Sequence, residues 1–326
     1  MTDIKLDEKG KKMLNLVRFN ARIPLTTLAK KVGLSKESAS YRLKSMVDKG
    51  ILSKFVPELN FHRMRMTIFR VALKLNNIDE KLEAEIGEYL HTLPSIWVGY
   101  MYGEWDIMFG VLVKGPLEFD SHMSKIMQKF GQHISEKAIC IQVNDFFLDY
   151  NHIYEKYSNE QIESFKEESD DIVILDDFDK QIIAHLYDNA RISYLEISQK
   201  MNVSPGLIKK RIIKLEKNKV IKRYMTSMDR TQLGYRKYKT LLYFNNLSLE
   251  VKNKVLTYCL SIPNITHVTT TTGSWDLEID YDAKDLTEFH TLFRDFRNKF
   301  SSQLVDYSVL LSYNYKYINP LKQIKL

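Results

Sequence analysis

Asn20-Ala21-Arg22-Ile23 recurs as Asn189-Ala190-Arg191-Ile192, 169 positions further along the chain. The same offset places Leu6-Asp7 on Leu175-Asp176. A period this long is far beyond that of a solenoid repeat. The chain therefore consists of two copies of one two-part repeat, and its 326 residues are long enough to hold two or more hydrophobic cores.

Composition and charge favour a folded protein that binds a polyanion. The 326 residues are 44% hydrophobic and carry a formal charge of +7. The basic charge is concentrated in residues 1–56, with 13 Lys/Arg against 5 Asp/Glu, and in residues 175–231, with 12 against 7. Cys140 and Cys259 have no partners at metal-ligand spacing, so we expect neither a disulfide framework nor a metal site. With no signal peptide or membrane segment apparent, we expect a cytoplasmic protein.

The first part of each copy has the pattern of a helix-turn-helix. In the second copy a helical apolar face ends at Asn189, and Asn202 stands where a sharp left-handed turn follows a second short helix. Ser204-Pro205 then supplies an N-cap and a first-turn proline for a third helix. Gly33 and Ser35 take these roles in the first copy. Apolar pairs after each third helix suit the short wing strands of a winged variant.

The outward faces of the third helices supply the candidate DNA contacts. With Ala39, Leu43 and Met46 pointing inward, a 100° advance per residue turns Glu37, Ser40, Tyr41 and Lys44 outward. The second copy presents Gly206, Lys209 and Lys210 there. Two basic, capped helices favour binding of duplex DNA over an ordinary solvated face. We predict DNA contacts from Ser35, Lys36, Ser40, Tyr41, Arg42, Lys44, Ser204, Lys209, Lys210, Arg211 and Lys214.

The second part of each copy has the element order βαββαβ, which is the ferredoxin-like order. The first copy begins with a strand over residues 68–75 and ends with one over residues 138–146. We expect helices on one face of each sheet, and apolar residues such as Phe69, Val71 and Leu73 to serve both faces, so that the uncovered faces pair. The predicted fold class is α+β.

Five segments follow from this pattern. They are a winged helix-turn-helix at 1–62, a ferredoxin-like domain at 66–150, an acidic linker at 151–174, and second domains of each kind at 175–232 and 236–318.

The second copy in particular resembles the Lrp/AsnC family of prokaryotic regulators. The resemblance is carried by Leu175-Asp176-Asp177-Phe178-Asp179, Val203-Ser204-Pro205 and Thr272-Gly273-Ser274-Trp275-Asp276, in that order and spacing. It implies a regulator whose two copies form an intramolecular pseudo-dimer, while association into higher homo-oligomers stays open. The first copy departs from the pattern, because Gly10 replaces the acidic residue supplied by Asp179.

The resemblance also implies an amino-acid effector near the Gly-x-Trp-Asp turns. The candidate effector-binding residues are Gly103, Asp106, Thr272, Gly273 and Asp276. An aspartate after a turn glycine suits the ammonium of an amino acid, and backbone N–H groups suit its carboxylate. A hairpin with a packed tryptophan explains the same residues. Both interpretations stay open.

These observations predict a DNA-binding transcription regulator without a cofactor or catalytic residues. The alternative from another class is an enzyme, since paired chains of this architecture resemble siroheme decarboxylases. We find no cluster of basic residues on the strands before the turns, where His267 stands alone. A sensor or interaction module that does not bind DNA is the third interpretation, which salt-dependent binding to a duplex would separate from the regulator.

Overall fold

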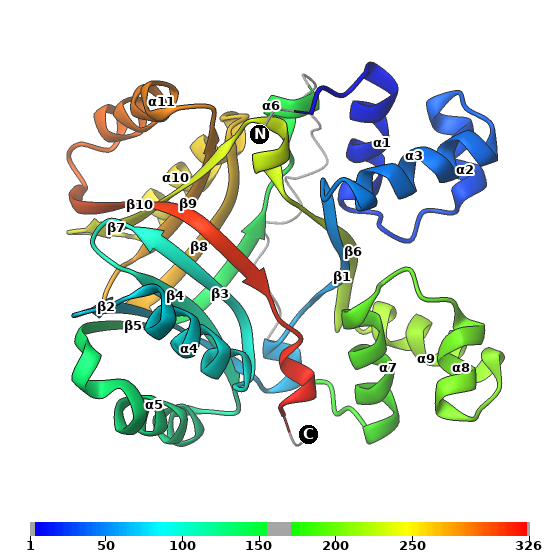
Figure 1. The fold of residues 1–326 in the computed structure, drawn as a ribbon, viewed down its shortest axis with the longest axis horizontal. Coiled ribbons are helices and arrows are strands. Elements are labelled where there is room, and N and C mark those ends of the chain that lie inside the picture. Colours follow the sequence, from blue (N-terminus) through cyan, green and yellow to red (C-terminus); the bar gives the residue numbers. More distant parts are fainter. Residues whose placement is uncertain (1–3, 155–170, 325–326) are drawn as a thin grey trace. The chain divides into compact units, whose positions relative to one another are not determined.

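The computed structural model describes residues 4–154 and 171–324 and divides them into two compact units (Figure 1). Unit 1 holds residues 4–65 and 171–234, and unit 2 holds residues 66–154 and 235–324. Each unit therefore takes one half of each copy. Of the acidic segment 151–174, residues 155–170 lie outside the described residues, and Asn151–Tyr154 form a short helix, α6.

Unit 1 contains two three-helix domains with the expected caps and turns. Gly33 and Asn202 adopt φ of 71° and 53°, as the sequence predicts for the sharp turn. Ser35 and Ser204 each accept a hydrogen bond from the backbone three residues ahead. The helices are α1 Glu8–Arg18, α2 Leu25–Val32 and α3 Lys36–Asp48 in the first copy, and α7 Asp177–Asp188, α8 Tyr194–Met201 and α9 Pro205–Lys217 in the second.

The strands that follow the third helices pair with each other across the two copies. β1 (Leu52–Leu59) and β6 (Ile221–Met228) form an antiparallel two-stranded sheet. Sequence reasoning placed short wing strands here but not their pairing, because nothing local to either strand marks its partner. The 3-10 helices His62–Met64 and Arg230–Leu233 follow these strands.

Unit 2 is a closed eight-stranded barrel made by both copies. Its strand order is β10-β3-β4-β2-β5-β8-β9-β7, so the edge strands of one ferredoxin-like sheet pair with those of the other, β5 with β8 and β10 with β3. The first copy supplies β2 Thr67–Leu75, α4 Glu80–His91, β3 Ser95–Tyr102, β4 Ile107–Val113, α5 Pro116–Phe130, a 3-10 helix Gly131–His133 and β5 Ile134–Phe147. The second supplies β7 Arg236–Phe244, α10 Leu249–Ser261, β8 Ile265–Gly273, β9 Leu277–Ala283, α11 Leu286–Lys299, β10 Leu304–Tyr317 and a 3-10 helix Pro320–Lys322.

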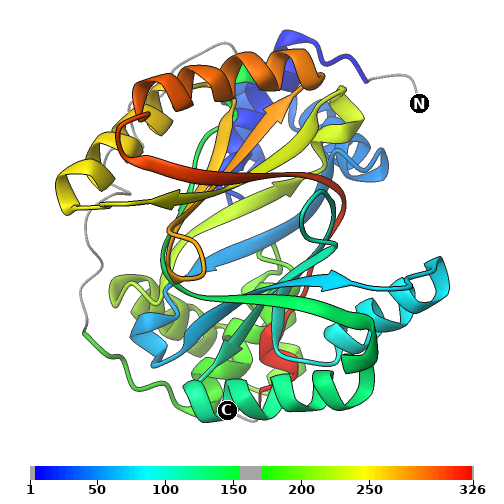
Figure 2. The same cartoon turned by 90° about the vertical axis from the view of Figure 1, so that its left-hand side faces the viewer.

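The helices of unit 2 lie outside the barrel, each pair over its own sheet (Figure 2). Phe69, Val71 and Leu73 all belong to the apolar core under α4 and α5, so the expectation that they serve both faces was wrong. Side chains alternate along a strand, and the residues between them face the other way. One of these is Arg70, which is 1% exposed. The sheets are therefore joined at their edges, around a polar interior. Within the described residues, no helix combines the length and the apolar character needed to cross a bilayer.

Candidate functional site

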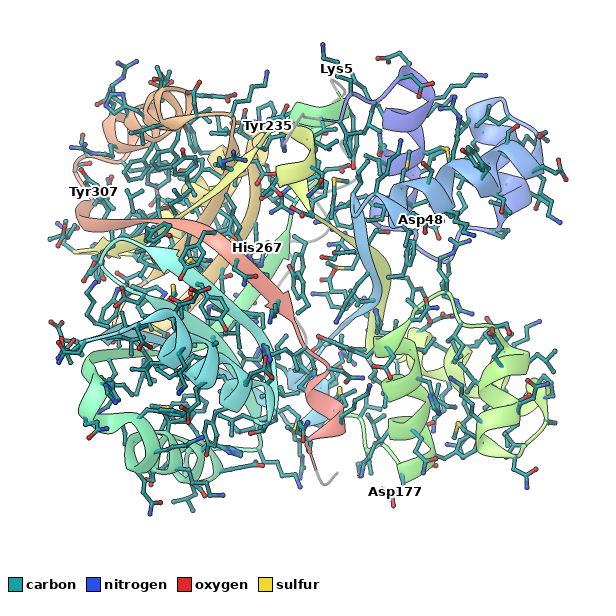
Figure 3. The ribbon with its side chains drawn as sticks, viewed as in Figure 1. Lys5, Asp48, Asp177, Tyr235, His267 and Tyr307 are labelled. Atoms are coloured by element: carbon teal, nitrogen blue, oxygen red, sulfur yellow. The ribbon has the colours of Figure 1, made fainter. Side chains whose placement is uncertain are left out.

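The outward face of α3 carries the side chains that the sequence placed there. Lys36, Glu37, Ser40 and Lys44 are exposed, and Tyr41 is 75% exposed. Ala39, Leu43 and Met46 are buried on the opposite face. Lys36, Ser40 and Tyr41 also line a shallow hollow of about 420 Å³, together with Leu25 and Glu37. Asp48 marks the far end of the helix (Figure 3).

The outward face of α9 is more basic. Lys209, Lys210 and Lys214 are exposed, while Ile208, Ile212 and Leu215 are buried. Ser204 caps the helix, and Pro205 occupies its first turn. A capped helix start still presents the positive end of the helix dipole, which attracts phosphate.

Arg42 and Arg211 are bound to carboxylates of their own domains. Arg42 Nη1 lies 2.8 Å from each carboxylate oxygen of Asp7, the N-cap of α1. This hydrogen bond is the main reason why the pKa of Asp7 lies below its ordinary value. Arg211 Nη1 lies 2.6 Å from Asp176 and 3.1 Å from the buried Asp179. Each arginine therefore ties the third helix to the start of the first helix of its domain.

The repeated Asn-Ala-Arg-Ile stretches hold the two helix-turn-helix domains together. Arg22 Nη1 donates to the carbonyl oxygen of Ala190 at 2.6 Å, and Arg191 Nη1 donates to that of Ala21 at 2.6 Å. The backbone N–H groups of Ala21 and Ala190 donate to Tyr224 and Phe55, on the strand of the other copy. The repetition of this stretch was visible in the sequence, but we interpreted it only as the end of a helix.

The Gly-x-Trp-Asp turns lie where the two sheets join. Gly103 and Gly273 have φ of 134° and 144°, and a Cβ on Gly273 would lie 2.5 Å from the carbonyl oxygen of Ile139 on β5. Thr272, which is exposed, pairs with Ile141 of the same strand.

Both turn aspartates accept hydrogen bonds from the backbone of their own sheet. Asp106 Oδ2 accepts from the Leu75 N–H at 2.8 Å, and Asp276 Oδ2 accepts from the Phe244 N–H at 2.7 Å. Lys74 lies 3.4 Å from the other oxygen of Asp106. Gly103, Gly273 and Thr272 therefore lie beside a strand of the other sheet at the barrel joints, whereas Asp106 and Asp276 are held by their own sheet.

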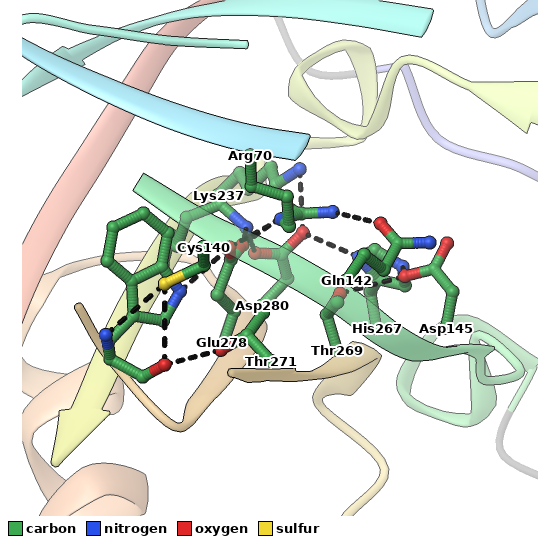
Figure 4. A network of polar contacts seen from close by, with 12 residues as sticks. Arg70, Cys140, Gln142, Asp145, Lys237, His267, Thr269, Thr271, Glu278 and Asp280 are labelled. Atoms are coloured by element: carbon green, nitrogen blue, oxygen red, sulfur yellow. Dashed lines mark hydrogen bonds and ion pairs between the residues drawn. The ribbon is translucent and has the colours of Figure 1, made fainter. Parts of the chain in front are cut away.

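A charged network fills part of the barrel interior and links the copies (Figure 4). Arg70 donates to both carboxylate oxygens of Glu278 at 2.5 Å. Lys239 Nζ lies 2.7 Å from Glu278 Oε2 and 2.7 Å from Asp280 Oδ1. The imidazole of His267 lies between two carboxylates, with Nε2 2.7 Å from Asp145 Oδ1 and Nδ1 3.3 Å from Asp280 Oδ2. Lys237 Nζ lies 2.7 Å from the same oxygen of Asp280.

The pairing in this network sets the charge of its members. Burial raises the pKa of a carboxyl group, but Arg70 and Lys239 outweigh burial at Glu278 and hold its pKa at about 2. Burial alone lowers the pKa of His267, and the carboxylates of Asp145 and Asp280 reverse that effect, so its pKa lies above the ordinary value. Glu278 is therefore ionised at neutral pH, and its network partner His267 is shifted toward its protonated form.

Sequence reasoning missed this network because its members come from separate strands. His267 is hydrogen-bonded, as the sequence suggested, but it is not isolated from other basic residues, since Lys237, Lys239 and Arg70 belong to the same cluster. At offsets of 169 and 170, Arg70 matches Lys239, whereas Met108 and Gly110 match Glu278 and Asp280. That mismatch between the copies was the available signal.

Comparison with known proteins agrees with the two domains of unit 1. A family model described as winged helix-turn-helix DNA-binding matches residues 6–53 and again residues 175–222. An uncharacterized HTH-type transcriptional regulator of Pyrococcus horikoshii is 30% identical over 108 residues, which are 32% of this chain and 72% of the relative. The transcriptional regulator AzlB of Bacillus subtilis is 29% identical over 124 residues, 38% of this chain and 79% of the relative.

A solved structure covers both copies at once. The siroheme decarboxylase NirDL superposes with a TM-score of 0.62 over 95% of this chain and 93% of that chain, at 15% sequence identity. At this identity the likeness concerns the fold.

Two helix-turn-helix domains with capped, outward-facing third helices define a DNA-binding protein of the winged-helix class. The relatives narrow this class to one family. The chain belongs to the Lrp/AsnC family of transcription regulators, in a tandem-duplicated form.

Proposed function

We propose that the chain recognises a specific duplex DNA sequence through both third helices, and that this recognition regulates transcription. The observation that carries the proposal is the pair of capped helices with exposed polar faces, held in one compact unit by Arg22 and Arg191. Two helices fixed in one unit suit two half-sites on one duplex. Lys36, Ser40, Tyr41 and Lys44 of α3, and Lys209, Lys210 and Lys214 of α9, are the proposed contacts.

Arg42 and Arg211 take a different part in this proposal. Because their guanidinium groups are held by Asp7 and by Asp176 and Asp179, we assign them to positioning the recognition helices. Ser35 and Ser204 act through their caps, which orient the first turn of each helix toward the phosphate backbone.

The test is the salt dependence of binding to duplex DNA. Each neutralised phosphate contributes roughly 0.9 to the slope of log K against log salt, so Lys209→Ala/Lys210→Ala should lower the slope by about one to two units. Lys125→Ala/Lys299→Ala is the control, because it removes the same charge from exposed positions on α5 and α11. An equal loss in both variants would show that net charge alone matters.

The second part of the proposal is an amino acid, or a similar small effector, at the second turn. Asp276 uses Oδ2 for the Phe244 N–H, and in the part of the chain that the structure describes its Oδ1 makes no hydrogen bond. Asp106 has both oxygens engaged. The second turn, with Thr272, Gly273 and Asp276, is therefore favoured over the first turn with Gly103 and Asp106. A ligand there would lie against the β5–β8 joint.

Calorimetric titration of the twenty amino acids tests this site. Asp276→Asn keeps an acceptor for the Phe244 N–H but removes the charge that would hold an ammonium, so it should weaken binding by tenfold or more. Asp106→Asn is the matched control at the first turn and should leave the affinity unchanged. Equal binding to the wild type and to Asp276→Asn would move the effector elsewhere.

We further propose that the chain regulates without catalysis. Arg70, Lys239 and His267 are each paired with carboxylates inside the barrel, so the basic groups of the interior are committed to those partners. The likeness to NirDL supports a common architecture. Incubation with siroheme should leave its absorbance spectrum unchanged, and a time-dependent change would favour the enzyme.

A further inference from the structure

The two recognition helices present different chemistry at every matched outward position. At the offset of 169, Glu37 of α3 matches Gly206 of α9, Ser40 matches Lys209, Tyr41 matches Lys210 and Lys44 matches Ile213. All eight residues are exposed. The buried positions are alike, since Ala39, Leu43 and Met46 match Ile208, Ile212 and Leu215. The copies thus share a core and differ where a ligand would touch them.

The charge of the two helices differs as well. Within its bounds α3 has three basic and two acidic residues, whereas α9 has five basic and one acidic. In addition, Tyr41 borders the hollow formed with Leu25, Lys36, Glu37 and Ser40 on the first domain. The outward face of α3 therefore carries charges of both signs and an aromatic ring, whereas that of α9 is cationic and apolar.

Each face favours a different base pattern in the major groove. A carboxylate such as that of Glu37 accepts from the N4 amino group of cytosine, and an apolar surface such as the Tyr41 ring contacts the methyl group of thymine. Lysine donates to O6 and N7 of guanine or to phosphate, which suits Lys209 and Lys210. Gly206 has no side chain to place opposite the base that Glu37 would read.

From this mismatch we infer that the chain recognises a non-palindromic operator with two unlike half-sites, a cytosine- and thymine-containing one under α3 and a guanine-rich one under α9. The symmetry of an operator mirrors that of its protein. Here the frame is symmetric, as the reciprocal bonds of Arg22 and Arg191 show, but the reading residues are not. The inference rests on the proposed DNA-binding function and specifies its target.

Selection of bound duplexes from a random pool by the full chain tests the inference. The enriched sequence should consist of two unlike halves. Lys209→Gln/Lys210→Gln should relax the preference in the guanine-rich half alone, and Glu37→Gln should relax it in the other half alone, each by about tenfold at the bases concerned. All these side chains are exposed, and circular dichroism of each variant checks that it is folded.

A face-transfer variant gives the sharpest outcome. Glu37→Gly/Ser40→Lys/Tyr41→Lys/Lys44→Ile places the α9 face on α3, and its selected sequence should become an inverted repeat of the guanine-rich half. An inverted repeat or a single half-site enriched by the unchanged chain overturns the inference while leaving DNA binding intact. Failure of the unchanged chain to bind any duplex in a salt-dependent way overturns the proposed function itself.

Discussion

Arg70 of the first copy and Glu278 of the second form a two-pronged ion pair inside the barrel, with side chains 2% and 1% exposed. A buried charge that loses its partner costs far more than the intact pair contributes, because the remaining charge stays desolvated. Glu278 also binds Lys239 and the indole N–H of Trp275. It is therefore the member on which more partners depend.

We predict that Glu278→Met destabilises unit 2 by about 3–5 kcal/mol, and Arg70→Met by less, because Glu278 then keeps Lys239. The double variant Arg70→Met/Glu278→Met should cost less than the sum of the two, since it removes both charges. Urea unfolding followed by tryptophan fluorescence measures this in unit 2 alone, because the chain's three tryptophans, Trp97, Trp105 and Trp275, all lie there. Additive losses would show that the pair is not coupled.

The raised pKa of His267 predicts a loss of stability at alkaline pH. Its protonated form is favoured in the folded state by Asp145 and Asp280, despite burial and the nearby Lys237. The stabilisation is complete below the ordinary value of 6.5 and disappears as the pH rises through the higher folded-state pKa. The free energy of unfolding should therefore fall relative to that of His267→Gln as the pH rises above 6.5 and through the higher folded-state pKa.

The comparison with His267→Gln is needed because other histidines act in the opposite direction. Burial lowers the pKa of His91 and His122, so each stabilises the folded state more as the pH rises. Their contribution cancels in the difference between the wild type and the variant. A difference that does not change with pH would contradict the assignment of His267.

The features that sequence reasoning predicted well are local ones. A cap such as Ser204 is decided by residues three positions apart, and the left-handed turn at Asn202 by one residue, so the helix-turn-helix emerges from neighbouring positions. The outward faces follow from helical periodicity, and exposure confirms them at Tyr41 and Lys209.

The features that could not be predicted depend on partners far along the chain. Arg70 and Glu278 are 208 positions apart, and only the closure of the barrel brings them together. The place of Arg42 on the helix predicts a DNA contact, but it gives no sign of the ion pair with Asp7, 35 positions earlier. Periodicity identifies which face a residue lies on, but it does not identify the residue opposite.

Gly273 should be intolerant of any side chain. Its φ of 144° disfavours a residue with a Cβ, and that Cβ would lie 2.5 Å from the Ile139 carbonyl oxygen and 2.8 Å from Cys140 Cα. We predict that Gly273→Ala lowers the free energy of unfolding of unit 2 by about 1–3 kcal/mol or more. Urea unfolding followed by tryptophan fluorescence measures this loss. Gly115→Ala is the control, because Gly115 has extended backbone with φ of 172°, and a Cβ added there would meet no atom within 4 Å. Equal stability of the two variants would show that the β5–β8 joint accommodates a Cβ at position 273 without loss of stability.

Arg22 and Arg191 should contribute to the affinity for a duplex with two half-sites, but not to the affinity for a duplex with one. Each guanidinium donates to backbone carbonyl oxygens of the other copy, and lysine keeps the charge but lacks the planar fork. We predict that Arg22→Lys/Arg191→Lys loosens the pair of domains. The affinity for a duplex with both half-sites should fall by about tenfold or more, because the second contact no longer benefits from a fixed geometry.

The affinity of the same variant for a duplex with one half-site should match that of the wild type, since charge and recognition helices are unchanged. Fluorescence anisotropy with the two duplexes at one salt concentration measures both quantities. An equal fall for both duplexes would mean that the arginines themselves touch DNA, and no fall for either would mean that β1–β6 pairing holds the domains without them. Only a selective loss on the longer duplex agrees with a joint that sets the spacing of the two recognition helices.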